Sequence, residues 1–201
     1  MKKTLLILCL MAFLSGSVLG QTSDSPYSIV VHAAGGYGEF EGLVEYRSTT
    51  HLVVAMGVDE KWSFSEYWAL VLGLDYQYWY FMDYYVYGGS HSVEPPPDNA
   101  NGHIIRLPVR LEYQKDWYYL ALGALIEKGF GASSEGNLKD IVSIGPTFEI
   151  GGRIRLSEKS TLRIGPQISV GHTLSIDKYQ NLECTRVEAS SLLRIGYEYH
   201  F

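Results

Sequence analysis

The last fifteen residues constrain the possible fold more than any other stretch. Val187 to Phe201 reads VEASSLLRIGYEYHF, in which apolar and polar positions alternate. The apolar row is Val187, Ala189, Ser191, Leu193, Ile195, Tyr197, Tyr199 and Phe201, and the other row is Glu188, Ser190, Leu192, Arg194, Gly196, Glu198 and His200. A period of two predicts a strand with one apolar face and one polar face. We expect such a strand, with aromatic residues at its end, in a transmembrane barrel; the alternative is the edge strand of a soluble sheet.

The first twenty residues predict export from the cytoplasm. Lys2 and Lys3 precede an apolar run from Leu5 to Leu14, and small residues follow up to Gly20. This is the pattern of a secretory signal peptide, so we expect residues 1–20 to be removed and residues 21–201 to form one domain. No stretch reaches the roughly 18 apolar residues that a spanning helix needs. If the chain enters a membrane, we therefore expect a closed β-barrel.

Composition narrows the class of protein further. Without Lys2 and Lys3 the chain has 22 acidic residues against 14 basic ones, which argues against nucleic-acid binding because that requires a basic surface. Cys184 is the one cysteine after residue 20, so no intrachain disulfide is expected. The chain contains 16 tyrosines and 21 glycines, and it shows no helical period. These features indicate an all-β protein with aromatic belts.

Alternation of apolar and polar residues predicts eight strands. They are 27–36, 51–58, 68–81, 103–113, 117–127, 141–155, 161–174 and 187–201. Longer connections follow the first, third, fifth and seventh strands, and mostly shorter ones follow the second, fourth and sixth. Outer-membrane barrels have short periplasmic turns and long outer loops. We therefore predict an all-β fold, an eight-stranded antiparallel up-and-down transmembrane β-barrel.

The alternation does not by itself show which face points inward. A soluble lipocalin-like barrel would place the apolar row inside, around a ligand. Here the apolar rows end in aromatic residues, and the polar rows mix Arg, Glu, Gly and Ser, which suits a narrow lumen filled by side chains. We predict an ion-pair network in this lumen and no open diffusion channel. Its predicted members are Asp75, Arg106, Arg110, Glu112, Glu149, Arg153, Arg163, Arg194 and Glu198.

Three segments carry a resemblance to a known family. IRLPVRLEY at 105–113, WYYLALGALIEKG at 117–129 and RIGYEYHF at 194–201 resemble strands of the bacterial outer-membrane β-barrel domain family that is abundant in Bacteroidetes and often labelled porin family. The resemblance covers nearly all of the chain after residue 20. It implies an outer-membrane location and transfers no catalytic residues. It also implies that the terminal aromatics Tyr197, Tyr199 and Phe201 form the signal that the barrel-insertion machinery reads.

The sequence gives little support for catalysis. The six histidines show no His-x-His or His-x-x-x-His spacing, so we expect no metal and no other cofactor. A barrel enzyme that modifies lipid would have to use His172 with Ser175. Residues three apart lie on opposite faces of a regular strand, which weakens this pairing of base and nucleophile. We therefore predict no enzymatic activity.

A binding role rests on the segment from Met82 to Gly102, which carries three consecutive prolines at 95–97. Tyr84, Tyr85 and Tyr87 would offer rigid aromatic contacts at the cell surface, or would only extend the aromatic belt of the barrel. We expect a monomer whose partners are outer-membrane lipid, the insertion machinery and a surface ligand or protein. A structural or surface-binding role is the main hypothesis. A lipid-modifying enzyme and a secreted lipocalin-like carrier remain the alternatives.

Overall fold

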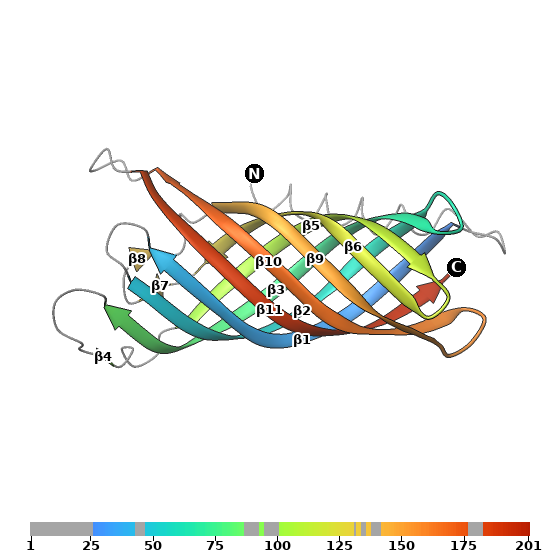
Figure 1. Ribbon diagram of the computed structural model, residues 1–201, viewed down its shortest axis with the longest axis horizontal. Coiled ribbons are helices and arrows are strands. Elements are labelled where there is room, and N and C mark those ends of the chain that lie inside the picture. The colour runs from blue at the N-terminus through green and yellow to red at the C-terminus, as the bar shows by residue number, and fades with distance from the viewer. Residues whose placement is uncertain are drawn as a thin grey trace, which may run out of the picture.

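Eight long antiparallel strands close into a barrel in the computed structural model (Figure 1). The structure describes residues 26–42, 47–86, 93–94, 101–130, 132–133, 136–137, 142–176 and 183–201. The long strands are β1 (Tyr27–Gly42), β2 (Arg47–Ser63), β3 (Trp68–Val86), β5 (Asn101–Lys115), β6 (Tyr118–Phe130), β9 (Val142–Arg155), β10 (Ser160–Ile176) and β11 (Glu183–His200). Three short strands, β4 (Val93–Glu94), β7 (Ala132–Ser133) and β8 (Gly136–Asn137), lie outside the barrel wall.

The long strands pair in chain order, and the last strand pairs with the first. Val31 of β1, for example, lies opposite Val58 of β2 on one side and opposite Tyr197 of β11 on the other. A closed sheet leaves no unpaired edge strand, because each strand hydrogen-bonds to a neighbour on both sides. In the described residues, no helix is long and apolar enough to cross a membrane.

The two ends of the barrel differ in their connections. Residues 64–67, 116–117 and 156–159 make three short turns at the end where β1 begins and β11 finishes, which we name the turn end (Figure 1). Asp116 has a φ of 43°, the left-handed conformation that a tight hairpin requires. The β4 and β7–β8 segments lie beyond the opposite end, the loop end. The connections after β3 and β6 are long, as predicted, whereas β1 and β2 are separated only by residues 43–46, so the predicted long connection after the first strand is wrong.

Several strands are longer than the sequence predicted. The stretch 37–42, predicted as loop, continues β1, and Asp59–Ser63, predicted as a turn region, continues β2. Likewise 82–86 belong to β3, 101–102 to β5, 175–176 to β10 and 183–186 to β11. Polar residues misled the prediction here because an inward-facing strand position of this barrel accepts a charge as readily as a loop does. The prolines at 95–97 and residues 1–20 lie outside the described residues.

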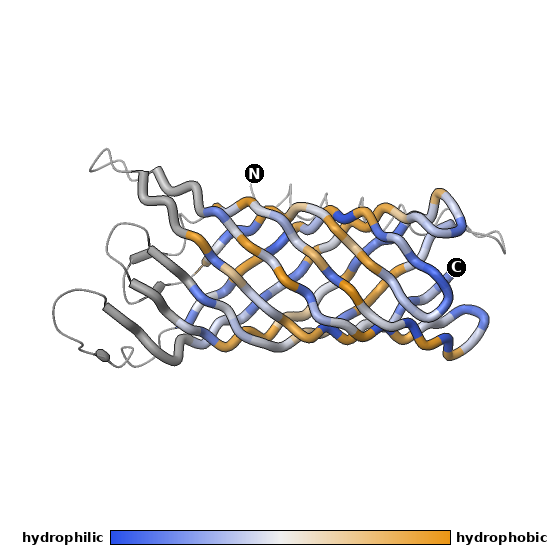
Figure 2. Tube along the Cα trace, in the orientation of Figure 1, coloured by the Kyte–Doolittle hydropathy of each residue, from blue (hydrophilic) through white to orange (hydrophobic). Residues whose placement is uncertain are grey.

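The polar rows face inward and the apolar rows face outward, as predicted. Along β6, buried and exposed side chains alternate, so Leu122 and Ile126 are half exposed on the outside while Ala121 and Leu125 are buried. Figure 2 shows the same alternation of hydrophilic and hydrophobic positions along the wall of the barrel. A soluble protein has no reason to expose so many large apolar side chains, whereas a bilayer solvates them.

Candidate functional site

The barrel lumen contains a dense set of buried ionisable side chains. Because β-strands alternate, every second residue of each strand points inward, and these positions carry the charges. The buried charged residues are Asp59, Lys61, Asp75, Arg106, Arg110, Glu112, Glu127, Glu149, Arg163, Glu188, Arg194 and Glu198, and the largely buried Arg153 joins them. A buried charge is stable only where it is paired and hydrogen-bonded, so their contacts define the site.

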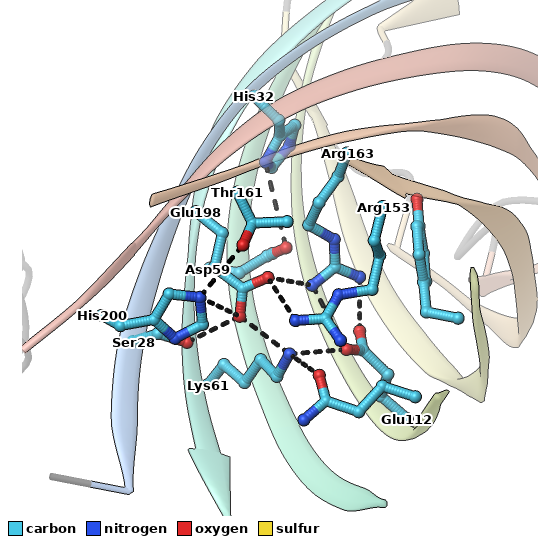
Figure 3. A network of polar contacts seen from close by, with 12 residues as sticks. Ser28, His32, Asp59, Lys61, Glu112, Arg153, Thr161, Arg163, Glu198 and His200 are labelled. Atoms are coloured by element: carbon cyan, nitrogen blue, oxygen red, sulfur yellow. Dashed lines mark hydrogen bonds and ion pairs between the residues drawn. The ribbon is translucent and has the colours of Figure 1, made fainter. Parts of the chain in front are cut away.

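Four side chains near the turn end form a ring of alternating charge (Figure 3), which we name the turn-end ring. Its members are Lys61 of β2, Glu112 of β5, Arg163 of β10 and Glu198 of β11. Lys61 Nζ lies 2.8 Å from Glu112 Oε1 and 2.8 Å from Glu198 Oε1. Arg163 lies 2.5 Å from Glu112 Oε2 and 3.5 Å from Glu198 Oε2. The ring crosses the lumen and ties together strands from different sides of the barrel.

A second ring, the central ring, lies next to the first and consists of Asp59, Arg110, Glu149 and Arg194. Arg110 pairs with Asp59 Oδ1 at 2.7 Å and with Glu149 Oε2 at 2.7 Å. Arg194 pairs with Glu149 Oε2 at 2.6 Å and with Asp59 through a short contact. These side chains come from β2, β5, β9 and β11. Two stacked rings of opposite charges leave little room for a continuous water column.

Tyr119 joins the two rings. Its hydroxyl donates to Glu149 Oε1 at 2.5 Å, and the Arg163 guanidinium lies 3.9 Å above the centre of its aromatic ring. A cation over an aromatic face is attracted electrostatically, more strongly where water is excluded. The two rings therefore form one connected polar network in the lumen.

The lumen toward the loop end is less densely charged. Arg106 Nε pairs with Glu127 Oε2 at 2.9 Å, and another Arg106 nitrogen donates to Ser169, whose hydroxyl lies 2.6 Å from that of Ser190. Beyond them, Trp79 lies over His51 with ring centroids 4.4 Å apart. Trp79 belongs to a buried apolar cluster with Ala34, Val53, Ala55, Ile104 and Leu192. This apolar cluster occupies part of the lumen toward the loop end.

The predicted network residues all face the lumen, but they do not all meet one another. Arg110, Glu149 and Arg194 meet in the central ring, and Glu112, Arg163 and Glu198 meet in the turn-end ring. Asp75 instead contacts His32, Arg106 contacts Glu127, and Arg153 lies at the margin, 3.8 Å from Glu198. The structure thus separates the nine predicted residues into distinct layers.

The predicted network did not include five ionisable residues that face the lumen: His32, Asp59, Lys61, Glu127 and Glu188. His32 and Glu188 lie in the polar rows of their strands, whereas Asp59 and Lys61 were not placed on a strand. Asp59 and Lys61 were missed because 59–66 reads as a polar turn. The alternation in fact continues through Trp62, with Val58, Glu60 and Trp62 on one face. This signal could have placed Asp59 and Lys61 on the lumen face. Both missed residues complete a ring, since each supplies the partner that two other ring members require.

His32, Asp59 and Asp75 bring three possible metal-ligand atoms within 4.8 Å of one another. His32 Nε2 lies 3.0 Å from Asp75 Oδ1, and Arg194 lies 2.6 Å from His32 Nδ1 and also contacts Asp59. Histidine spacing along the chain could not reveal this cluster because its members come from different strands. Arg110 and Arg194 already supply positive charge to Asp59, so the donor set does not fit a cation without displacing them.

The residues predicted for catalysis or surface binding lie away from the lumen network. His172 is exposed on the outer wall, and Ser175 follows it in β10. Tyr84 and Tyr85 lie in β3, opposite Glu94 and Val93 of β4. Tyr87 lies outside the described residues.

Aromatic side chains form a belt on the outer wall at the turn end. Its exposed members include Tyr27, Trp62, Phe64, Tyr67, Trp68, Trp117, Tyr197 and Tyr199. The Tyr199 and Phe201 rings touch with centroids 5.4 Å apart. Toward the loop end Tyr37 and Tyr78 follow Tyr27 and Trp68 along the same strands by about ten residues, the length with which a tilted strand crosses a bilayer. An aliphatic band lies between them, with exposed Val54, Leu122 and Ile195.

Comparison with known proteins supports the fold. The chain is similar to the outer membrane protein OprG from Pseudomonas aeruginosa, with 14% identity and a TM-score of 0.50 over 88% of this chain and 97% of that one. It is also similar to Neisserial surface protein A (13% identity, TM-score 0.49, 88% and 98% covered) and to Ail, the attachment invasion locus protein of Yersinia pestis (11%, 0.41, 87% and 99%). No family model and no curated protein matches the chain. The chain thus has the fold of a small outer-membrane β-barrel.

Proposed function

We propose that this chain is a small integral outer-membrane barrel with a side-chain-filled lumen, which acts as a structural element or as a surface-binding module through its loops. The observation that carries the proposal is the reversal of polarity: large apolar side chains are exposed on the wall while charged ones are buried inside. Such a surface needs a lipid solvent. The aromatic belt at the turn end supports the same environment.

The orientation follows from the connections. Short turns in outer-membrane barrels face the periplasm and long loops face outward, so the turn end belongs on the periplasmic side. Tyr84 and Tyr85, near the end of β3, then lie at the outer end of the barrel, which supports a binding role there. Export requires the signal peptide predicted at residues 1–20.

The two alternatives receive less support. A lipocalin-like carrier needs an apolar interior around its ligand, but this interior contains two rings of ion pairs. A lipid-modifying enzyme would need a nucleophile beside a base. For the one sequence candidate, His172 with Ser175, the spacing of three residues does not favour such a pair on a regular strand.

Fractionation of expressing cells, followed by electrophoresis with and without boiling, tests the proposal. We expect the protein in the outer-membrane fraction, with a band that shifts on boiling because a closed barrel stays folded in cold detergent. A soluble periplasmic protein without a heat shift would contradict the proposal. Surface proteolysis of intact cells, with cleavage between 87 and 100 but not in the short turns, would check the orientation.

A further inference from the structure

At the turn end the lumen opens into a pocket that lies outside the two ion-pair rings. This cavity of about 320 Å³ is lined by Asp116, Arg153, Arg155, Glu158, Thr161 and His200. It lies just outside the turn-end ring, since Arg153 reaches toward Glu198 and Thr161 lies opposite Glu198 in the neighbouring strand (Figure 3). We name it the mouth pocket.

The wall of the mouth pocket is basic. Arg153 and Arg155 occupy successive inward positions of β9, and Thr161 is the cross-strand partner of Arg155. The Thr161 hydroxyl lies 3.3 Å from His200 Nε2, which fixes both side chains on the adjoining strands. Two guanidinium groups, a hydroxyl and an imidazole on one wall form a site that suits a carboxylate.

Arg153 has hydrogen-bonding capacity left over. Its contact with Glu198 is long, at 3.8 Å, whereas Glu198 accepts closer contacts from Lys61 and Ser28, at 2.8 Å and 2.9 Å. The buried Arg153 Nε makes no hydrogen bond to any described residue. A guanidinium carries five N–H donors, so a ligand can engage it without breaking the turn-end ring.

The rim of the pocket is acidic. Asp116 belongs to the turn at 116–117, and Glu158 belongs to the turn at 156–159, so both carboxylates come from the connections rather than from the wall. A simple anion would pass two negative charges on its way in. A ligand with a carboxylate at one end and an ammonium group at the other would match both the wall and the rim.

We propose that the mouth pocket binds a small zwitterion of the amino-acid type. Its carboxylate lies between Arg153 and Arg155, and its ammonium group stays at the rim near Asp116 and Glu158. The volume of the pocket is ample for such a ligand, because pockets of 300 Å³ and above accommodate small molecules. The pocket opens to the periplasm if the turn end faces the periplasm, so this part of the inference rests on the proposed function.

Titration of the purified full chain in detergent micelles, followed by backbone amide NMR at constant ionic strength, tests the proposal. We expect L-alanine to shift the amide signals of Thr161 and His200 with saturation. Acetate should bind about fivefold more weakly, because it lacks the second charge, and methylammonium should not saturate. The measurement requires a folded barrel but no membrane location, so it can fail while the proposed function holds.

Two variants and a matched control sharpen the test. Arg155→Gln should weaken alanine binding about tenfold, because a charge-assisted hydrogen bond is lost. Glu158→Gln should reduce the preference for alanine over acetate. Lys159→Gln removes one positive charge, as Arg155→Gln does, from the turn that follows β9, but Lys159 does not line the pocket, so it should change nothing. The proposal would be overturned if alanine did not saturate the shifts or if acetate bound as tightly as alanine. It would also be overturned if Lys159→Gln weakened alanine binding as much as Arg155→Gln does.

Discussion

At the scale of single residues, the lumen shows how buried charges are tolerated in this barrel. Each carboxylate of the central ring contacts both arginines, so removal of one group takes away one of the two partners of each neighbouring group. Glu149 also accepts a hydrogen bond from Tyr119. The stability of the ring therefore depends on its completeness more than on any single pair.

Glu149→Gln should destabilise the barrel by about 3 kcal/mol, because Arg110 and Arg194 would keep Asp59 but lose the second carboxylate that balances their charge inside the lumen. Denaturant unfolding of the protein in micelles or vesicles measures this change. Glu66→Gln serves as the control, since Glu66 is an exposed turn residue and its loss should be close to neutral. Equal stability of the two variants would show that the ring contributes nothing net.

At the scale of the strands, close packing between neighbouring strands decides which residues each position accepts. Pro108 of β5 cannot donate to a neighbouring strand, and the β3–β5 pairing is interrupted there, between the pairs Leu72–Val109 and Asp75–Arg106. Gly73 of β3 faces the proline ring, where a Cβ would approach Pro108 Cγ to 2.6 Å. Pro108 in the IRLPVRLEY segment thus depends on a glycine in the adjacent strand β3.

Gly145→Ala should destabilise the barrel by about 1 to 3 kcal/mol, because the added methyl group would overlap the carbonyl oxygen of Val170, a backbone atom that cannot swing aside. Gly35→Ala is the matched control, since the nearest atom to its Cβ is Val53 O at 3.9 Å, an ordinary contact. Unfolding midpoints of both variants check the difference. A neutral Gly145→Ala would mean that β9 and β10 separate easily.

Leu122→Arg should cost about 2 to 4 kcal/mol if the wall faces lipid, because Leu122 is 58% exposed in the middle of the aliphatic band. The same charge at Trp117→Arg should cost about 0 to 1 kcal/mol, since Trp117 lies in a turn at the interface and is 72% exposed. Refolding equilibria in lipid vesicles measure both. Similar costs at the two depths would contradict a membrane-spanning β6.

At the scale of the whole molecule, the barrel is a closed wall around a filled core. The turn-end ring, the central ring and the Trp79 cluster succeed one another along the lumen. An eight-stranded barrel has an interior that side chains just fill. Its surface of contact with other molecules is therefore limited to the loops, the mouth pocket and the lipid-facing wall.

Planar bilayers that contain the purified protein should show no steady current comparable with that of a water-filled porin, because side chains block the lumen at several levels. A heat-shifting band from the same preparation controls for folding. Stable, large conductance steps from wild-type protein would contradict the filled lumen. Such steps from Trp79→Ala alone would identify the Trp79 cluster as the main barrier.

The sequence by itself determined the class of fold, the number of strands and the face that each strand turns inward. The alternation of neighbours two residues apart predicts the strands and their two faces, which a single strand displays without reference to the rest of the chain. The aromatic ends of the apolar rows and the composition of the polar rows then indicate which face turns inward. The same local signal misplaced Asp59 and Lys61, because a charged strand end and a polar turn have similar composition. The tertiary structure decided which charges meet. Lys61 pairs with Glu198, 137 residues away, and Asp59 meets Arg194, 135 residues away. Such pairs depend on the stagger of strands around a closed barrel, and this stagger is a property of the whole ring of strands that no single segment encodes.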